Sequence, residues 1–381
     1  MRAVRSVYVA GTGLHPFGRF DDKPLTAIGA VAVRAALAEA RVGRGGFDAT
    51  FCGCVYGGVA SGHKVLTALG LSGGPIVNVE AGCASGGAAL ALGVAEIATG
   101  RAERVLVLGL EKMPRGMIRS SFFDPWREEA GLAATPAYFA LRAQRLMRES
   151  DVRIEDLARV SVTYHAHGVH NPNAMYRKLV TLEQVLGSPV VCEPLRLLML
   201  CAPNEGAAAV LLSATPPPDG PAVRVAAVQV RSHLAGNVLG EHTPLSGLVR
   251  DGMPTPTEMA AAAAYAEAGV GPRDLDLVEL QDTDAARAIL SAEELGLSPR
   301  GGGGRWVRDG LGEMTSAQPV NPSGGLLSKG EPLGASALAQ VIEIVWQLRG
   351  ACGARQVAGA RVGLAHTVGR GANACATILV R

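Results

Sequence analysis

The sequence predicts an α/β protein built from two similar halves, and three observations support this prediction. Short apolar runs of strand length alternate with longer segments of helical periodicity. The proline-rich stretch TPPPDG at residues 215–220 divides the chain near its middle. In each half a stretch that begins with Asn and ends in Gly-Gly, at residues 78–87 and 321–325, precedes a helix, which indicates a weak internal repeat.

These observations predict an N-terminal half over residues 1–214, a linker over residues 215–220 and a C-terminal half over residues 221–381. Within the first half, aromatic and charged residues cluster between positions 114 and 191. A long insertion between core strands is typical of a loop or cap that shapes a substrate pocket. We therefore expect residues 114–191 to form such an inserted cap.

The N-terminal half is expected to begin with a strand at residues 6–10 that ends in a turn at Gly11-x-Gly13. This Gly-x-Gly lacks the rest of a dinucleotide-binding fingerprint, so we predict no Rossmann-type cofactor site. The other elements expected in this half are helices at residues 26–40 and 88–99, and strands at residues 47–57, 104–109 and 209–212.

The C-terminal half repeats this alternation of strands and helices. Its expected elements are strands at residues 222–230, 276–280, 362–365 and 374–380, and helices at residues 285–295 and 335–348. Residues 366–371, HTVGRG, are expected to form a tight glycine loop that starts at His366.

The overall composition limits the class of protein. Apolar residues make up 48% of the 381 residues and charged residues 18%, which is typical of a compact globular chain. A net charge of +2 and an aromatic content of 4% give no support for nucleic-acid binding. Seven cysteines at irregular spacing predict no disulfide framework and a reducing cytoplasmic location. No window is apolar over a length that would span a membrane.

Two groups of metal-ligating residue types occur, and neither predicts a metal site. Cys52-x-Cys54 has no second ligand pair nearby. His165, His167 and His170 lie within six residues, but no carboxylate or cysteine accompanies them at ligand spacing. We expect these histidines to contact the substrate pocket or a second subunit.

Cys83 carries the strongest functional pattern in the chain. It follows an apolar run at residues 75–77 and precedes the small-residue helix expected at residues 88–99, so it lies at a strand-to-helix junction. Backbone N–H groups and the dipole at a helix N-terminus favour an anion and lower the pKa of a thiol there. The alternative role for a free cysteine is that of a small buried hydrophobe. The coincidence of a strand, a cysteine and a glycine-rich helix start favours a nucleophile.

The stretch Asn-Val-Glu-x-x-Cys-Ala-Ser-Gly around Cys83 resembles the nucleophile motif of the thiolase superfamily, in particular the sterol-carrier-protein-type thiolases and thiolase-like lipid-transfer proteins. Residues 111–113 and 201–209 resemble further segments of the same family, in the same order. The resemblance implies stacked αβαβα layers, with two duplicated halves and two mixed sheets around buried helices. It also implies that Cys83 takes up an acyl group from a coenzyme A thioester, which is a substrate and not a permanently bound cofactor.

Two other motifs depart from the family pattern. In these thiolases a Gly-His-Pro histidine takes the thiol proton, and a His-Asp-Cys-Phe segment supplies an oxyanion donor and a base cysteine. Here the corresponding stretches are GEP at residues 330–332 and QDTD at residues 281–284. Thr283 cannot replace a thiolate base, so other groups would have to support Cys83.

We expect four residues to give that support. Gln281 can still donate an amide hydrogen bond to an oxyanion. Glu331 can act as a base towards Cys83, or as a donor where burial raises its pKa. His366, at the start of the glycine loop, is our preferred replacement for the missing acid/base, and Asp282 is a further candidate carboxylate.

Other residues of interest are expected to bind coenzyme A or to pack in the core. The positions of Ser232, His233 and Gly325 relative to the family motifs indicate a coenzyme A site, although no charged motif marks one. Cys375 could in principle replace the missing thiol. It lies in an apolar strand, however, and is expected to pack in the core.

Three functions are compatible with these motifs. The preferred function is an acyl-CoA-dependent acyltransferase that uses Cys83 as a covalent nucleophile to form or cleave a carbon–carbon or carbon–acyl bond. The first alternative is a thiolase-like retro-aldolase that acts on a β-hydroxyacyl-CoA, for which Asp282, Asp284 and Glu331 are candidate bases. The second alternative is a non-catalytic acyl-CoA-binding homologue. The resemblance also implies a homodimer and a possible zinc-ribbon/OB-fold protein partner.

Overall fold

The computed structural model describes residues 5–43, 45–71, 74–116, 126, 129, 135–234, 253–369 and 373–381. The strands are β1 (Tyr8–Gly18), β2 (Ala49–Gly53), β3 (Ile76–Val79), β4 (Arg104–Lys112), β5 (Val190–Cys192), β6 (Leu195–Arg196), β7 (Glu205–Ser213), β8 (Arg224–Arg231), β9 (Leu277–Glu279), β10 (Val362–Gly369) and β11 (Asn373–Val380). The α-helices are α1 (Leu25–Glu39), α2 (Ser61–Ala68), α3 (Ser85–Ala98), α5 (Thr135–Glu149), α6 (Ile154–Gly168), α7 (Leu182–Leu186), α8 (Pro256–Ala268), α9 (Ala285–Glu294), α10 (Gly303–Arg308), α11 (Gly325–Lys329) and α12 (Leu333–Arg349). Short 3₁₀ helices occupy Leu197–Met199, Pro272–Asp274 and Gly353–Arg355.

The strand pairing shows that the two halves repeat one topology. In the first half, β1 pairs antiparallel with β7, β7 pairs antiparallel with β4, and β4, β2 and β3 are parallel. In the second half, β8, β11, β10 and β9 follow the same series of antiparallel, antiparallel and parallel pairings. A parallel bridge between Val278 and Val320 stands where β3 stands in the first half. The duplication expected from the sequence is therefore present in the fold.

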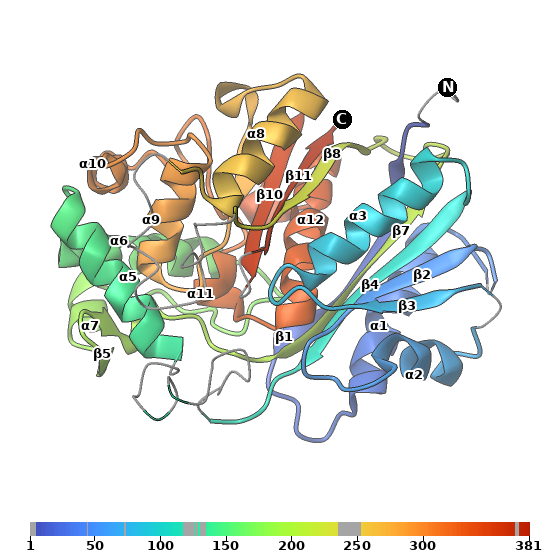
Figure 1. Ribbon diagram of the computed structural model, residues 1–381, viewed down its shortest axis with the longest axis horizontal. Coiled ribbons are helices and arrows are strands. Elements are labelled where there is room, and N and C mark those ends of the chain that lie inside the picture. Colours follow the sequence, from blue (N-terminus) through green and yellow to red (C-terminus); the bar gives the residue numbers. More distant parts are fainter. Residues whose placement is uncertain are drawn as a thin grey trace.

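The two halves share one continuous sheet, in the order β3-β2-β4-β7-β1-β8-β11-β10-β9 (Figure 1). The family resemblance implies two mixed sheets, and in the structure these are joined into one. They join because β1 and β8, the first strands of the two halves, pair at Tyr8 and Arg224. The Val9 N–H donates to the Val223 carbonyl and the Val225 N–H to the Val7 carbonyl, both at 2.9 Å. This pairing satisfies backbone groups that an open sheet edge would leave unpaired.

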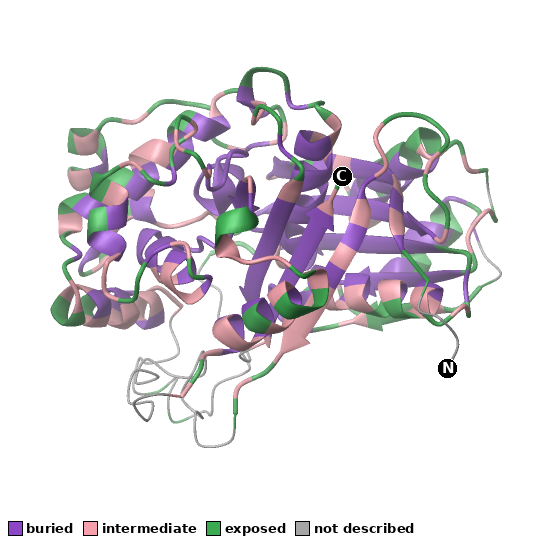
Figure 2. Cartoon of the chain, turned by 90° about the horizontal axis from the view of Figure 1, so that it is seen from above, coloured by how far each residue is buried: buried purple, intermediate pink, exposed green. Residues whose placement is uncertain are grey.

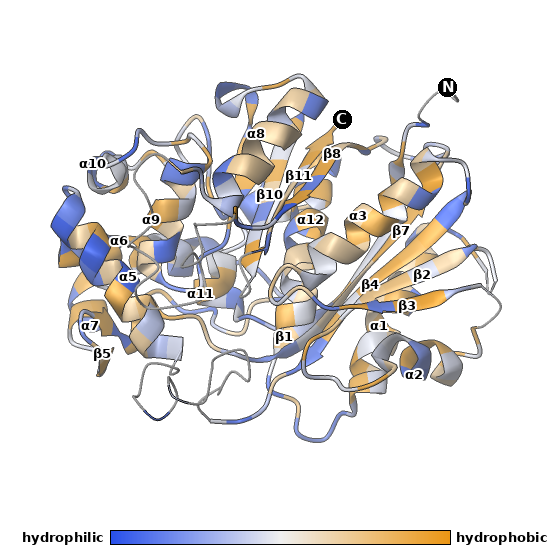
Figure 3. Ribbon diagram, viewed as in Figure 1, coloured by the Kyte–Doolittle hydropathy of each residue, from blue (hydrophilic) through white to orange (hydrophobic). Residues whose placement is uncertain are grey.

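Helices α3 and α12 form the middle layer of the molecule. Helix α12 packs on β4 and β7 from the first half and on β10 from the second, and α3 packs on β2, β4, β8 and β11. Of the 17 residues of α12, 14 are buried, which only a position between two sheet surfaces allows. Helices α1 and α2 cover the outer face of the first half, and α8 covers the outer face of the second. Figure 2 shows the buried residues concentrated in these central strands, and Figure 3 shows that the strands are largely apolar. The αβαβα layering implied by the family resemblance is thus observed.

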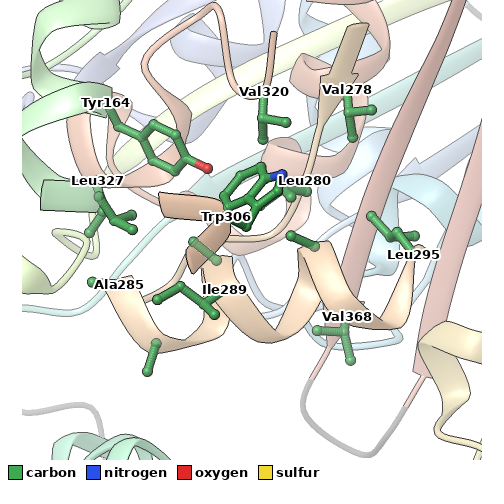
Figure 4. Close-up of a cluster of buried hydrophobic side chains, with 14 of the residues drawn as sticks. Tyr164, Val278, Leu280, Ala285, Ile289, Leu295, Trp306, Val320, Leu327 and Val368 are labelled. Atoms are coloured by element: carbon green, nitrogen blue, oxygen red, sulfur yellow. The ribbon is translucent and has the colours of Figure 1, made fainter. Parts of the chain in front are cut away.

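The inserted segment packs against the second half. Residues of α6, such as Leu157 and Tyr164, share one apolar core with Leu280 and Ile289 from around α9. Figure 4 shows Tyr164 next to Trp306 of α10, with Ile289 and Leu280 nearby. This contact ties α6 to the loops that follow β9; whether residues 114–191 act as a cap stays a prediction.

Two local predictions were wrong, and both concern glycines. The expected turn at Gly11-x-Gly13 lies inside β1, which runs on to Gly18. A Cβ at Gly11 would lie 2.1 Å from the Ala36 carbonyl oxygen, and one at Gly13 would lie 2.0 Å from that of Ala32. These glycines let α1 pack directly onto the strand, so they mark a close approach and not a turn.

The expected glycine loop at residues 366–371 also begins too early. Strand β10 continues to Gly369, and His366 pairs with Ala376 of β11 within it. Antiparallel pairing with β11 overrides the local glycine signal. Residues 370–372 lie outside the described part of the chain.

Candidate active site

Cys83 lies in a tight turn between β3 and α3, two residues before the helix starts. The Ser85 hydroxyl locks this turn, because it accepts from the Ala81 N–H at 2.8 Å and donates to the Gly82 carbonyl at 2.6 Å. Gly82 has φ = 59°, a left-handed conformation that glycine adopts without steric cost. The Cys83 side chain is 7% exposed. The thiol therefore projects from a fixed backbone at the N-terminus of a 14-residue helix, as the sequence predicted.

Helix α12 begins next to this turn, and glycines make the approach possible. A Cβ at Gly86 would lie 2.9 Å from the Gly334 carbonyl oxygen, and one at Gly334 would lie 2.6 Å from that of Gly53. Glu111 fixes the junction, since its carboxylate accepts from the Gly334 N–H at 3.2 Å. Glu331 comes two residues before α12, so the contact between the two helix starts also brings Glu331 towards Cys83.

The Glu331 carboxylate is buried and has a donor on each oxygen. The Gln281 amide donates to Oε1 at 2.8 Å, and the Cys201 thiol lies 3.4 Å from Oε2. Burial raises the pKa of the Cys201 thiol well above its usual value, and the nearby charges of Glu331, Asp282 and Cys83 raise it further. Cys201, Glu331 and Cys83 therefore belong to one electrostatic environment, which is assembled from three separate segments.

The amide of Gln281 thus donates to Glu331, whereas the sequence suggested a donor for an oxyanion. That role of Gln281 stays a prediction. Asp282 is fully buried, and its carboxylate accepts from the Leu326 and Leu327 N–H groups at 2.8 and 3.1 Å, at the start of α11. This contact makes Asp282 an anchor for the segment that leads to Glu331, and its proposed chemical role remains untested.

The residues suggested for coenzyme A lie in two different settings. Gly325 has φ = 59°, and a Cβ there would lie 2.2 Å from an Asp282 carboxylate oxygen, so local packing alone requires a glycine. Ser232 and His233 follow β8, which ends near the Cys83 turn, because Val230 packs with Ala81 and Cys375. The proposed coenzyme A contacts remain a prediction at all three residues.

Residues 7–215 match the sequence profile described as the thiolase N-terminal domain, and residues 243–381 match the one described as thiolase C-terminal domain-like. The chain belongs to the thiolase family.

Relatives over nearly the full chain agree with this assignment. The acetyl-CoA acetyltransferase of Methanothermobacter thermautotrophicus is 36% identical over an alignment of 380 positions that covers 96% of this chain and 97% of that protein. Sterol carrier protein 2 of Oryctolagus cuniculus is 34% identical over an alignment of 389 positions that covers 98% of this chain and 71% of that protein. The solved Ltp2-ChsH2(DUF35) aldolase has the same fold, with a TM-score of 0.85 at 24% identity over 100% of this chain and 99% of that one. These matches confirm the thiolase resemblance and the thiolase fold.

This thiolase places His366 away from the Cys83 turn. His366 Nε2 lies 3.0 Å from Thr257 Oγ1 of α8, on the outer face of the sheet. Its neighbour Thr367 donates to Gln340 of α12, on the inner face. Because side chains alternate along a strand, His366 faces away from the layer that contains α3. The geometry therefore does not favour His366 as an acid/base partner of Cys83.

His366 instead predicts how stability depends on pH. Burial, together with the positive charge of Arg287, holds the pKa of His366 well below its usual value of about 6.5. Below about pH 6.5, His366 binds a proton in the unfolded chain but not in the folded one. The free energy of unfolding therefore falls as the pH falls. In a His366→Gln variant the decrease in the free energy of unfolding on acidification should be smaller, by up to about 1.4 kcal/mol per pH unit. Urea unfolding between pH 7 and pH 5 measures it, with exposed His63→Gln as the control. Equal pH slopes in wild type and His366→Gln would contradict the assignment.

The motif resemblance aligns Thr283 with the thiolase base cysteine, and the Thr283 hydroxyl donates to an Asp284 carboxylate oxygen at 3.2 Å. The same oxygen accepts from Arg142 of α5 at 2.5 Å. Asp284 also accepts from the Arg287 N–H at 2.9 Å and so caps α9. Sequence reasoning missed the contact from Arg142, because α5 lies more than a hundred residues away in the chain. This contact ties α5 directly to the QDTD stretch at residues 281–284.

The remaining candidates from the sequence do not form a metal site. His165 and His167 are buried in α6, and Nδ1 of His167 lies 3.0 Å from the Asn321 carbonyl oxygen. Across residues that the structure describes, no group of three or more His, Cys, Asp and Glu side chains is arranged to hold a metal ion. Cys375 packs against Gly87 of α3, in the core position expected from the sequence. No helix in the described ranges is long and apolar enough to cross a bilayer.

Proposed function

We propose that this thiolase is an acyltransferase that carries the acyl group of a coenzyme A thioester on Cys83. In the first step Glu331 takes the Cys83 proton, the thiolate attacks the thioester carbonyl, and the bond to the coenzyme A sulfur breaks. Coenzyme A leaves as a thiol with the proton from Glu331. In the second step an acceptor attacks the acyl-Cys83 carbonyl and gives a proton to Glu331, which returns it to Cys83.

The observation that carries this proposal is the hydrogen-bonded Glu331 carboxylate at the start of α12, beside the Cys83 turn. A proton acceptor is most useful when it is held in one rotamer, and the donors on both oxygens hold Glu331 in this way. The position of Cys83 at the N-terminus of α3 favours the thiolate that the first step requires. The 36% sequence identity to an acetyl-CoA acetyltransferase supports an acyl-CoA as the acyl donor.

Thr283 favours acceptors that need no strong base. Its hydroxyl is held by Asp284 and cannot act as a thiolate would. An electron-rich nucleophile, such as a phenolic ring carbon, an oxygen or a nitrogen, attacks without prior removal of an α-proton. We therefore propose acceptors of this kind in preference to simple ester enolates, which form only after an α-proton has been removed.

A retro-aldolase is the second candidate, and the same carboxylate supports it. Glu331 can take the proton of a β-hydroxyl group, after which the carbon–carbon bond breaks and releases an aldehyde or ketone. The Ltp2-ChsH2(DUF35) aldolase shares the fold, which supports this chemistry on such a scaffold. The retained Cys83 turn favours the acyltransferase, because aldol cleavage needs no acyl-enzyme.

Intact-protein mass spectrometry with short and aromatic acyl-CoAs tests the proposal. An added mass equal to the acyl group, located on Cys83 by peptide mapping, is the expected result. Release of an aldehyde or ketone from a β-hydroxyacyl-CoA, without any acyl adduct, would replace the acyltransferase by the aldolase. Binding of acyl-CoA without either reaction would leave a non-catalytic homologue.

We also propose that the enzyme is a homodimer that associates through β3. This strand ends the sheet, pairs only with β2 among the described strands, and leads directly into the Cys83 turn. Val77 of β3 is 42% exposed. An apolar edge strand of this kind is a template for pairing with a second chain. Analytical ultracentrifugation of wild type and Val77→Lys should give a dimer and a monomer; a monomeric wild type would refute the proposal. The name of the Ltp2-ChsH2(DUF35) aldolase joins two proteins, which supports a further protein partner for this chain as well. Co-purification can test whether that partner is the zinc-ribbon/OB-fold protein that the family resemblance implies.

A further inference from the structure

Cys201 lies between the two loops that depart from the thiolase pattern. Its N–H donates to the Thr283 carbonyl at 2.9 Å, and the next residue, Ala202, accepts from the Glu331 N–H at 2.9 Å. Isolated β-bridges between Leu200 and Asp284 and between Pro203 and Glu331 extend these backbone contacts. The backbone of residues 200–203 is therefore fixed on both sides. This fixed backbone holds the Cys201 sulfur 3.4 Å from Glu331 Oε2.

The chemistry of this contact is that of a neutral donor and a carboxylate. Burial and the surrounding negative charges keep Cys201 in the thiol form, so it can donate but does not compete as a base. Hydrogen bonds to an ionised acceptor are stronger than those between neutral groups. Gln281 donates to the other oxygen, so both Glu331 oxygens accept hydrogen bonds that favour the charged carboxylate.

We propose that Cys201 is a positioning residue, whose thiol keeps Glu331 ionised and directed for proton transfer from Cys83. This inference rests on the proposed acyl transfer for its purpose, but the pairing itself can be measured separately. It gives the chain two cysteines with different tasks: Cys83 forms the covalent bond, and Cys201 sets the state of the base.

The other titratable groups around the pair come from separate segments. Asp282, from the loop after β9, has its carboxylate bound to the Leu326 and Leu327 N–H groups. Cys83 comes from the start of α3, and its charge contributes to the environment of Cys201. Lys329 lies on the same segment as Glu331, but its ammonium pairs with Glu279 at 3.5 Å. Cys201 donates its hydrogen bond to Glu331 directly, from a thiol 3.4 Å from Oε2.

Loss of the thiol should therefore raise the pKa of Glu331. In Cys201→Ala the acid limb of the pH–rate profile should move to higher pH by about half to one pH unit, because the charged Glu331 carboxylate loses a hydrogen bond. Cys201→Ser retains a donor and should restore the limb. Cys201→Val removes the donor at nearly the same volume, so it distinguishes lost hydrogen bonding from a cavity and replaces the alanine variant if that variant does not fold.

Two readouts separate this inference from the proposed function. The rate at which iodoacetamide alkylates Cys83, followed by peptide mapping from pH 4 to pH 9, reports on the pair without any acyl transfer. Acetylation of Cys83 by acetyl-CoA over the same range reports on the reaction. We expect an inflection in the wild-type alkylation curve that is absent in Glu331→Gln, shifted upward in Cys201→Ala and Cys201→Val, and restored in Cys201→Ser.

An alkylation curve that is the same in wild type and Cys201→Val would overturn the inference. A shift that appears equally in Cys201→Ser would also overturn it, because a general disturbance and not the donor would then be the cause. If the alkylation curves behave as expected but no acyl-CoA acylates the wild type, the Cys201–Glu331 pairing stands and the proposed acyl transfer fails.

Discussion

Replacing Cys83 with alanine is expected to abolish formation of the acyl-enzyme. Alanine preserves the turn, because Gly82 and Ser85 make the local hydrogen bonds and the side chain itself is small and buried. The reaction then has no nucleophile, so kcat/KM for coenzyme A release should fall by about 10⁴-fold or more. Intact-mass measurement after incubation with the acyl-CoA that labels wild type should detect no adduct.

The matched control for this experiment is Cys192→Ala. Cys192 is another free cysteine, and it lies at the end of β5 in the small ribbon outside the main sheet. Its loss should leave the adduct and kcat/KM within about twofold of wild type, as expected for a substitution away from the site. An adduct of unchanged yield in Cys83→Ala would move the covalent chemistry to a different group and refute the proposed mechanism.

The turn around Cys83 could be predicted from the sequence because its determinants are local. Gly82, Cys83 and Ser85 lie within four residues, and the hydrogen bonds that fix the turn join neighbours in the chain. The helix after the turn and the strand before it follow from periodicity. The two-half organisation was also visible, because each half contains a stretch that begins with Asn and ends in Gly-Gly before a helix. The Gly-Gly pairs themselves open different helices, α3 in the first half and the short α11 in the second.

The support around Glu331 could not be predicted in the same way. Gln281, Cys201 and Glu331 come from three distant segments, and only the packing of the loops after β9 and before β7 and α12 brings them together. Family motifs drew attention to Gln281 and Glu331 but gave Cys201 no role. The only available signal was that Cys201 begins the segment at residues 201–209 that resembles the family and leads into β7.

The position of His366 shows that nearby glycines alone do not predict a loop. Its neighbours suggested a loop at the active site, yet pairing with β11 extends β10 and alternation directs the ring to Thr257. A glycine in this strand serves close packing, since a Cβ at Gly369 would lie 2.3 Å from the Ala81 carbonyl oxygen. The strand end thus meets the Cys83 turn through backbone, and the histidine lies on the other face.

Replacing Glu331 with glutamine is expected to slow acylation of Cys83 by about 10²- to 10⁴-fold, the usual contribution of a positioned general base. Glutamine has nearly the same shape and remains within reach of Gln281 and Cys201, but it cannot take a proton. Binding of the acyl-CoA should change little, so the loss should appear in the rate of acylation and not in the affinity. Quenched-flow mixing followed by mass spectrometry measures that rate directly.

Two further variants decide whether the loss reflects proton transfer. Glu149→Gln changes an exposed carboxylate on α5 and should keep the acylation rate within about twofold of wild type. Glu331→His introduces the residue that thiolases with the Gly-His-Pro motif use, and it should recover part of the rate near neutral pH because imidazole can also accept the thiol proton. If Glu331→Gln acylates as fast as wild type, Glu331 is not the base. If histidine fails to rescue a folded and slow enzyme, the carboxylate charge itself is needed, and its partners Gln281 and Cys201 then set the chemistry of this thiolase apart.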